Sequence, residues 1–384
     1  MKILHVCLAC FYIDNYGYQE NILPKFHKMM GHDVRIVAST ETFDKEGQLT
    51  YTTPSEYVNE NGILVTRLPY KKCLSKFLIR KIRRYVGLKK YLDDFKPDFI
   101  FLHDFQFMDI DIICKYAKKH NVKVSADCHS DFSNSARSFV SRHLLHGILY
   151  KHCARIVNPY VTKFYGVLPA RVDFLKNVYH LPKDKCELLI MGVDDSLIDD
   201  YSKPGKIKAI RERFGIKEND FLVVFGGKID LFKTQVFLLI DAVKRIKNVK
   251  LLIFGTVIPE LKEKLLSLID NEQIFYGGWQ DSKGSFDIFS AANVACFPGR
   301  HSVYWEQAAG LGCPLIVKRW AGTEHVNING NTLFLDDDSV EEIQNKIELL
   351  LIKANYTQLL EKANLAKTSF YYSVIAKKVI DDLN

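Results

Sequence analysis

Glu306 is the single charged residue in residues 302–317 (SVYWEQAAGLGCPLIV), a run that predicts a short apolar helix, a glycine-rich break and a buried strand. A carboxylate loses hydration when it is packed, so it must either reach solvent or meet hydrogen-bond donors. The run is therefore consistent with an ordinary surface-facing glutamate and also with an acid that binds a ligand.

Two lysines form a second candidate site. Lys228 and Lys233 lie in FGGKIDLFKTQ, directly after a predicted strand at 221–225 and before a predicted helix at 236–247. Glycines let a ligand approach the backbone, and two ammonium groups beside a helix N-terminus favour phosphate. The pattern predicts a diphosphate cradle, although exposed lysines before a helix are also common. The P-loop pattern GxxxxGK[ST] is absent, so ATP hydrolysis is not expected.

Imidazoles follow two predicted strands of the first half. His129 (DCHSDF) follows residues 122–126, and His103 (FLHDF) follows residues 99–102. A neutral imidazole can donate or accept a hydrogen bond near neutral pH. Each is interpreted either as a contact to a sugar or leaving group, or as a structural histidine. The loop containing Gly17 also follows a strand and opens a helix, where backbone N–H groups favour an anion.

These residues are positioned by strands that alternate with helices along the chain, which predicts the α/β class. The 384 residues exceed what one core accommodates, and the apolar content of 47% suffices for two cores. We predict two facing Rossmann-like domains with an interdomain cleft at the carboxyl ends of both sheets. Their predicted bounds are 1–194 and 195–360, with a linker near 203–206, and a C-terminal helix at 361–384 could cross back to the first domain.

Five segments share one resemblance. GGKIDLFK (226–233) resembles GRxxxxKG, EQAAGLGCP (306–314) resembles EAMAxGxP, and MGVD (191–194) resembles NGVD. GHDVRIVAS (31–39) and WAGTEHVNINGN (320–331) resemble GHEVxVxT and GGxxEIVxDGxNG. These are motifs of retaining glycosyltransferases with the GT-B fold, the large group 1 family of surface polysaccharide and glycolipid type. The similarity covers nearly the whole chain in the correct order.

The resemblance implies transfer of a sugar from a UDP- or GDP-linked donor to a lipid-linked saccharide or glycan, with retained configuration, no metal and no cofactor besides the donor. The first domain would be the acceptor side and the second would bind the nucleotide sugar. Lys228 and Lys233 would hold the diphosphate and stabilise the leaving group, and His129 would contact the transferred sugar near the reaction centre. Glu306 would bind the ribose. The other implied donor contacts are Gly17, Gly227, Trp279, Ser302, Tyr304 and Trp305.

The chain departs from the family pattern in three places. The first glutamate of the family's Glu-x7-Glu pair falls on Pro298, and residues 300–305 replace the segment that normally touches the donor sugar. Lys228 stands where the family has arginine, which keeps the charge but loses the bidentate fork. The EAMAxGxP spacing has one extra residue. A catalytically silent homologue that binds nucleotide sugar or glycan is therefore an alternative, and a sugar-nucleotide epimerase is another.

The net charge of +8 and the isoelectric point near 8.8 indicate an acidic partner. Residues 71–90 contain nine Lys or Arg and no acid, with apolar residues at helical spacing, which predicts an amphipathic basic helix. We expect it either to pack as an ordinary solvated helix or to dock on an anionic membrane near a lipid-linked acceptor, and we expect no nucleic-acid partner. The basic residues assigned to this role are Lys76, Arg80, Lys81, Arg83 and Arg84.

No metal site is predicted. Asp109 and Asp111 match a metal-binding DxD, but they open a predicted helix, where acids suit the helix dipole. Cys7 and Cys10 form a CxxC inside a predicted strand, with no second pair to complete a zinc site. The nine scattered cysteines suit reduced thiols, and no apolar run reaches the roughly 20 residues that span a bilayer. The expected location is the cytoplasm, at the inner face of the cell membrane.

Overall fold

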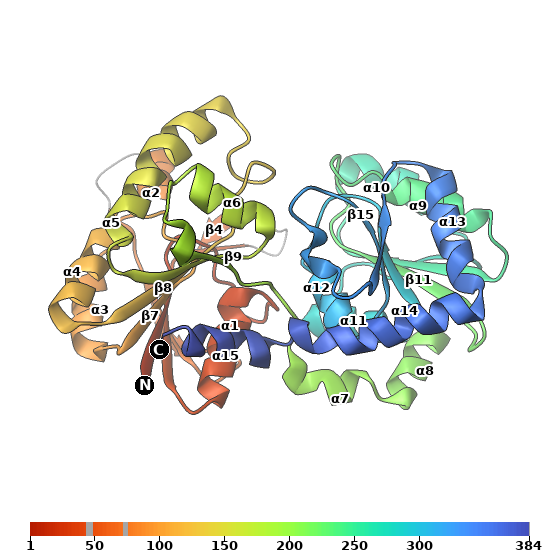
Figure 1. Ribbon diagram of the computed structural model, residues 1–384, viewed down its shortest axis with the longest axis horizontal. Helices are drawn as coiled ribbons and strands as arrows, with labels where there is room; N and C mark the ends of the chain where they lie inside the picture. Colours follow the sequence, from red (N-terminus) through yellow and green to blue (C-terminus); the bar gives the residue numbers. More distant parts are fainter. Residues whose placement is uncertain (44–48, 72–75, 384) are drawn as a thin grey trace. The chain divides into compact units, whose positions relative to one another are not determined.

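The computed structural model describes residues 1–43, 49–71 and 76–383, apart from the side chains of Lys76 and Phe77. The chain divides into two compact α/β units (Figure 1): unit 1 contains Met1–Ile190 and Ile375–Asn384, and unit 2 contains Met191–Val374. The predicted α/β class is confirmed. The residues around 203–206 are not a linker, because helix α8 (Pro204–Arg213) begins there with proline in its first turn.

Unit 1 is built on an eight-stranded sheet with the order β10-β9-β8-β7-β1-β2-β6-β5. Neighbouring strands are parallel except β5 and β6, and the central strands are buried apolar runs, as in a sheet covered on both faces. Its strands are β1 (Lys2–Cys7), β2 (Asp33–Ser39), β5 (Glu56–Val58), β6 (Leu64–Leu68), β7 (Phe99–Leu102), β8 (Lys123–Cys128), β9 (Val161–Gly166) and β10 (Cys186–Leu188). A separate hairpin pairs β3 (Glu41–Phe43) with β4 (Leu49–Tyr51).

The helices of unit 1 connect these strands. They are α1 (Gln19–Met29), α2 (Lys76–Ile82), α3 (Leu88–Phe95), α4 (Ile110–His120), the π-helical segment η1 (Ser141–Tyr150), α5 (Lys151–Val157), α6 (Pro169–Asn177) and the 3-10 turn η2 (Lys183–Lys185). The C-terminal helix α15 (Tyr372–Asp381) enters unit 1 at Ile375 and lies beside α1 (Figure 1), where the carbonyl of Ala376 contacts His27. Tyr165 anchors it further by donating to Asp382 at 2.6 Å.

Unit 2 contains a six-stranded parallel sheet with the order β13-β12-β11-β14-β15-β16. Its strands are β11 (Phe221–Gly226), β12 (Val249–Phe254), β13 (Ile274–Tyr276), β14 (Val294–Phe297), β15 (Leu315–Lys318) and β16 (Thr332–Leu335). Because β11 and β14 are neighbours, the loops that follow them start at the same edge of the sheet. Those loops contain the predicted lysines and residues 300–303.

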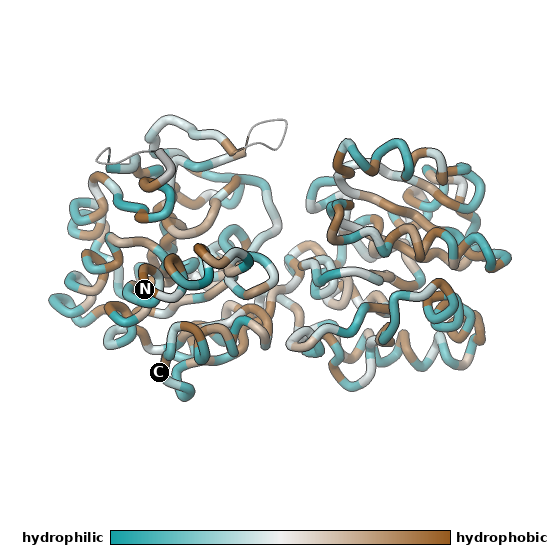
Figure 2. The backbone as a smooth tube through the Cα atoms, turned by 90° about the horizontal axis from the view of Figure 1, so that it is seen from above, coloured by the Kyte–Doolittle hydropathy of each residue, from teal (hydrophilic) through white to brown (hydrophobic). Residues whose placement is uncertain are grey.

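Helices and 3-10 turns surround this sheet: η3 (Asp195–Leu197), α7 (Ile198–Tyr201), α8, α9 (Val236–Lys244), α10 (Pro259–Leu266), α11 (Ser282–Ala291), α12 (Tyr304–Gly310), η4 (Glu324–Val326), α13 (Val340–Leu351), α14 (Lys353–Ala366) and η5 (Lys367–Phe370). In Figure 2 hydrophobic and hydrophilic stretches alternate along the outer helices, as expected for helices that bury one face. Within the described ranges, no helix combines the length and the apolarity needed to cross a bilayer.

Candidate functional site

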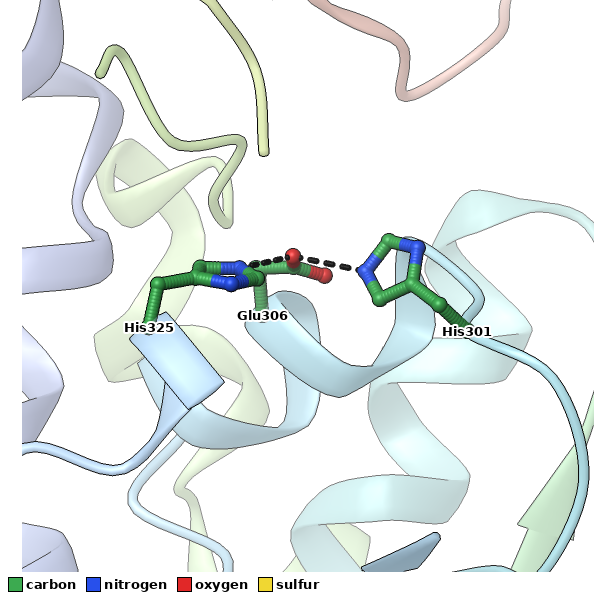
Figure 3. Close-up of side chains that lie close together, drawn as sticks. All are labelled: His301, Glu306 and His325. Carbon is green, nitrogen blue, oxygen red and sulfur yellow. Dashed lines mark hydrogen bonds and ion pairs between the residues drawn. The ribbon is translucent and has the colours of Figure 1, made fainter. Parts of the chain in front are cut away.

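Glu306 lies in the first turn of α12 and is completely buried in unit 2. Its Oε1 accepts hydrogen bonds from Nε2 of His301 at 2.8 Å and from Nε2 of His325 at 2.7 Å (Figure 3). Its Oε2 is also buried and has no hydrogen-bond partner among the described residues. Glu306 therefore meets hydrogen-bond donors and does not reach solvent, which is one of the two sequence interpretations. Its Oε2 remains able to accept from a further donor.

The carboxylate of Glu306 is held in its ionised form. Burial alone would raise its pKa, but His301 and then His325 lower the pKa to about 2. An ionised carboxylate can only accept, so the Nε2 atom of each ring must carry the proton in these contacts. The two histidines thus fix both the charge and the orientation of the acid, which suits recognition of a hydroxyl group.

The loop after β11 brings positive charge to the same edge of the sheet. Gly227 has a φ of +135°, a conformation that favours glycine. Lys228 is exposed, whereas Lys233 is half-buried, and the guanidinium of Arg300 stacks 4.7 Å from the ring of Phe232. Burial lowers the pKa of Lys233, and Lys228 and Arg300 lower it further against the opposite effect of Asp230. Because three cations influence one another here, a bound anion such as a phosphate would be favoured.

The structure brings some of the other predicted donor contacts to this loop. Ser302 Oγ and Tyr304 Cδ2 each lie 3.9 Å from the position that a Cβ atom on Gly227 would take. Trp305 has no exposed surface and packs against Phe297 and His301, so its ring is part of the core. Trp279 follows β13 and is 62% exposed.

Unit 1 contains a cavity of about 600 Å³ at the carboxyl ends of β1, β7 and β8. His129 lines it together with Glu20, Arg83 and Asp104. His129 Nε2 lies 3.4 Å from Oδ2 of the buried Asp127, and the backbone N–H of His129 donates to Asp104 Oδ1 at 3.3 Å. Burial would lower the pKa of His129, but Asp127, then Asp104 and Glu20, raise it.

The predicted residue Gly17 precedes Tyr18, which lines this cavity, but Gly17 is not itself among the lining residues. His103 is not exposed to the cavity either. It is completely buried behind Asp127, to which its Nδ1 lies at 3.0 Å. His129 therefore lines the cavity, whereas His103 contacts Asp127 from the buried side.

The basic stretch does not form the continuous helix that its pattern predicts. Helix α2 ends at Ile82, and Arg83 has a φ of +51°. The side chain of Arg83 donates to the carbonyl oxygens of Ala9 at 2.5 Å and Gln106 at 3.4 Å, which are acceptors that a free helix would not offer. Tertiary hydrogen bonds thus outweigh helical periodicity here.

Arg84, Arg80 and Lys81, from the same stretch, also face groups of unit 1. Arg84 pairs with Asp109 at 2.8 Å, Arg80 pairs with Glu41 at 3.1 Å, and Lys81 lines the cavity. Lys76 lies in α2, but its side chain is outside the described residues. Asp109, from the DxD pattern, has a structural role, because it also accepts from the backbone N–H of Tyr85 at 2.7 Å.

His301, Glu306 and His325 are also residue types that bind transition metals, and their ligand atoms all lie within 4.8 Å of one another. In Figure 3, however, the two rings approach Oε1 from opposite sides, so a metal bound to all three would require the rings to move. The sequence identified residues 300–305 as unusual, but it did not predict the hydrogen bond between His301 and Glu306. It also gave no role to His325. The histidines within the first unit's core, His5 and His27, were also missed.

Residues 220–353, within unit 2, match the family model described as Glycosyl transferases group 1. No curated protein matches the chain by sequence.

Several solved structures resemble the whole chain. A glycosyltransferase from Rickettsia africae is 14% identical, with 99% of this chain and 97% of that chain covered and a TM-score of 0.70. Anabaena HepE, solved with UDP and glucose, is 14% identical, with coverage of 100% and 99% and a TM-score of 0.67. The UDP-GlcNAc 2-epimerase of Neisseria meningitidis is 14% identical, with coverage of 100% and 99% and a TM-score of 0.64.

The chain has the GT-B fold of two Rossmann-like units, as the sequence predicted. The predicted resemblance to the group 1 glycosyltransferases is confirmed by the family match in unit 2. At these identities the solved structures show the fold alone, so activity and substrates are a separate question.

Proposed function

We propose that this protein is a retaining glycosyltransferase that uses a nucleotide-diphosphate sugar. The observation that carries the proposal is the buried Glu306 carboxylate, which is fixed by two histidines and keeps Oε2 for one further donor. A ribose hydroxyl supplies that donor. The cations of the loop after β11 then bind the diphosphate, and this pairing of acceptor and cations lies inside the family-matched segment.

In the proposed reaction the bond between the anomeric carbon and the diphosphate breaks, and the negative charge grows on the departing phosphate oxygen. Lys228 and Lys233 stabilise that charge, which is the kind of contribution that lowers the barrier most. His129 contacts the transferred sugar. The acceptor oxygen forms the new bond to the anomeric carbon with retention of configuration, its proton passes to the departing phosphate oxygen, and no metal is used.

The donor can be tested directly. UDP is the first nucleotide to try, since HepE was solved with UDP and glucose, and GDP is the comparison. Calorimetric titration of the purified protein with UDP should give binding that is lost in Lys233→Ala. Slow hydrolysis of a UDP- or GDP-sugar, or transfer to a lipid-linked saccharide, should then identify the sugar. Binding without any turnover in acceptor extracts would instead support a catalytically silent homologue.

A second candidate is a sugar-nucleotide epimerase. It is favoured by the grouping of Glu20, Asp104 and His129 on the unit 1 cavity, because epimerisation needs groups that remove and return a proton. Incubation of UDP-GlcNAc with the protein in heavy water, without acceptor, separates the two activities. An epimerase releases a new sugar nucleotide that contains deuterium, whereas a transferase releases UDP and leaves the remaining donor unlabelled.

We further propose that the acceptor is carried on a lipid and that the enzyme works at an anionic membrane. The sequence assigned membrane contact to residues 71–90, but several of those side chains are engaged inside unit 1. The surface around η1 is a better candidate. Phe139, Val140, Leu144 and Ile148 are exposed there, Ile148 by 64%, and no Asp or Glu occurs from residue 132 to 172. Apolar side chains flanked by Arg and Lys suit an anionic bilayer surface.

Cosedimentation with vesicles tests this surface, using phosphatidylglycerol-containing vesicles against pure phosphatidylcholine ones. Binding should require the anionic lipid and should fall in the double variant Leu144→Ser/Ile148→Ser. Leu365→Ser is the matched control, because Leu365 is 78% exposed on α14 and belongs to unit 2. Equal loss in the control variant, or binding unaffected by the double variant, would contradict the assignment.

A further inference from the structure

Three buried histidines form a hydrogen-bonded chain through unit 1. It starts at the backbone carbonyl of Ala376 in α15, passes through His27, His5 and His103, and ends at Asp127 in β8. The four contacts are His27 Nε2 to Ala376 O at 3.3 Å, His27 Nδ1 to His5 Nε2 at 3.0 Å, His5 Nδ1 to His103 Nε2 at 3.0 Å, and His103 Nδ1 to Asp127 Oδ2 at 3.0 Å. All three rings have zero exposure, so no bulk water completes them.

The two ends of this chain fix the number of protons that it must hold. The carbonyl at one end and an ionised carboxylate at the other only accept, so both terminal contacts need an N–H from histidine. The two contacts between rings need one N–H each. Four contacts therefore require four ring protons, but three neutral imidazoles carry only three. The chain can be fully hydrogen-bonded only when one ring is an imidazolium.

The proton count alone would allow the extra proton on any of the three rings, and the neighbouring groups decide among them. When His27 and His5 are neutral, His27 donates to Ala376 and accepts from His5 at Nδ1, and His5 Nδ1 accepts from His103. His103 is the ring left with protons on both nitrogens, and it lies directly against the carboxylate of Asp127. An unpaired buried charge elsewhere in the chain would be costly, whereas this one is paired.

We propose that His5, His27 and His103 are positioning residues that keep an imidazolium at His103 against Asp127, and that this charge controls the protonation of His129. Asp127 Oδ2 is shared, because it also accepts from Gln19 Nε2 at 3.0 Å and lies 3.4 Å from His129 Nε2. A cation at His103 offsets part of the negative charge of Asp127, so His129 is held less strongly in its protonated form. Only the role of His129 rests on the proposed function, since the proton pattern is a property of the resting protein.

The electrostatic surroundings agree with this arrangement. Burial would lower the pKa of His103, but Cys7, then Asp127 and Glu20, raise the pKa to about 9. Burial lowers the pKa of His27 to about 3, and burial together with the other two rings lowers that of His5. Further titratable groups near the three rings are Asp104, which faces His129 beyond the Asp127 end, and the partly exposed His32, which faces His27 at the other end.

The chain also explains what His27 contributes. If His27 is replaced by leucine, His5 loses its acceptor and can reverse its tautomer, so that His5 Nδ1–H donates to His103 Nε2. Two neutral rings then satisfy both remaining contacts, and the imidazolium is no longer required. If His27 is replaced by asparagine, the amide oxygen can still accept from His5 Nε2–H, and the original order is kept.

Nitrogen NMR of the full-length protein with ¹⁵N-labelled histidine tests the proposal without any substrate. In the parent protein at pH 7.5, His103 should show two protonated ring nitrogens, and His5 and His27 should each show a single proton on Nε2. His27→Leu should give a His103 ring with one protonated nitrogen, and His27→Asn should restore the doubly protonated ring. A singly protonated His103 in the parent protein would overturn the proposal, whatever the activity of the protein.

The link to His129 is tested by its titration in the same samples. Loss of the neighbouring cation should raise the pKa of His129 in His27→Leu, and the limb of the activity–pH profile that follows His129 should move to higher pH in parallel. His32→Leu is the matched control, since no ring nitrogen of His32 belongs to the chain, and it should leave His103 and His129 unchanged. Thermal denaturation should first show that the parent and His27→Leu proteins are both folded. An equal pKa of His129 in the two proteins would then refute the coupling.

Discussion

Substitution of Glu306 by glutamine separates the role of this residue in folding from its role in binding. The amide oxygen of the introduced glutamine can still accept from His301 and His325, so the folded structure should be retained. The other oxygen, Oε2, is replaced by an N–H₂ group that cannot accept from a ribose hydroxyl. A hydrogen bond to a charged acceptor contributes about 1.5–3 kcal/mol, and 1.4 kcal/mol corresponds to a factor of ten. The donor dissociation constant should therefore rise about 10- to 100-fold.

The alanine substitution should behave differently. Glu306→Ala removes the acceptor from two imidazoles whose side chains are 12% and 3% exposed. Breaking a buried charged pair in this way costs about 3–5 kcal/mol of stability. We therefore expect Glu306→Ala to lower both turnover, by at least about 100-fold, and the urea midpoint of unfolding. Glu306→Gln should lower donor affinity with little change in that midpoint.

The matched control is Glu341→Gln, because Glu341 is an exposed glutamate of α13 whose partner is Arg245 at 3.0 Å. Calorimetry with UDP and urea unfolding followed by circular dichroism would be measured for all three variants. Unchanged UDP affinity in Glu306→Gln would refute the assignment of Oε2 to the ribose. Equal unfolding midpoints in the Ala and Gln variants would show that the two histidines do not depend on this acceptor.

Four further outcomes are expected, three for the loop after β11 and one for metal dependence. Lys233→Ala should reduce turnover at least about 100-fold. The UDP affinity of the parent protein should fall as pH rises, and the fall should begin at a lower pH than for an ordinary lysine because the pKa of Lys233 is lowered. A UDP affinity that is independent of pH up to pH 10 would contradict this. Gly227→Ala should be destabilising by about 1–2 kcal/mol because φ is +135°, whereas Gly205→Ala, in helix α8 with open space around it, should be neutral or stabilising in the same unfolding assay. Dialysis against EDTA should leave turnover unchanged, and restoration of activity by an added divalent cation would show that a metal is needed.

Alternation of short apolar runs with amphipathic ones was enough to predict the class of both units, because parallel strands buried on two faces have few polar positions. The order of the family-like segments was enough to predict the GT-B fold. Side-chain partners were less predictable. Glu306 was correctly selected as an acid that had to be compensated, but no local pattern pairs it with His325, which comes from a different turn of unit 2.

The basic stretch shows where periodicity failed. Residues 71–90 have helical spacing, yet Arg83 takes a left-handed φ and donates to carbonyls of other segments. Local sequence contains no information about such distant acceptors. The segment η1 gives a second case, because its apolar side chains Leu144 and Ile148 are exposed. In both cases burial was decided by which neighbours were available, and a pattern within one segment cannot encode that.

The histidine chain leads to a last prediction, on the pH dependence of stability. His103 has a raised pKa, so its contribution to the free energy of unfolding is complete below its ordinary value of 6.5 and is lost as pH rises toward about 9. His5 and His27 have lowered pKa values, so their contributions are complete above 6.5 and are lost as pH falls. The contribution of the chain should therefore be largest near pH 6.5.

The lowered pKa of Glu306 does not produce this maximum, because it affects stability only below about 4.5. Urea unfolding of the parent and His27→Leu proteins between pH 5.5 and 9 should show the difference. The parent should be most stable near pH 6.5 and should lose stability toward pH 9, whereas His27→Leu should lose much less over that alkaline range because it no longer holds the imidazolium. Parallel stability curves for the two proteins would mean that His103 is neutral in both, and the proton count along the chain would then have to be satisfied without a fourth proton.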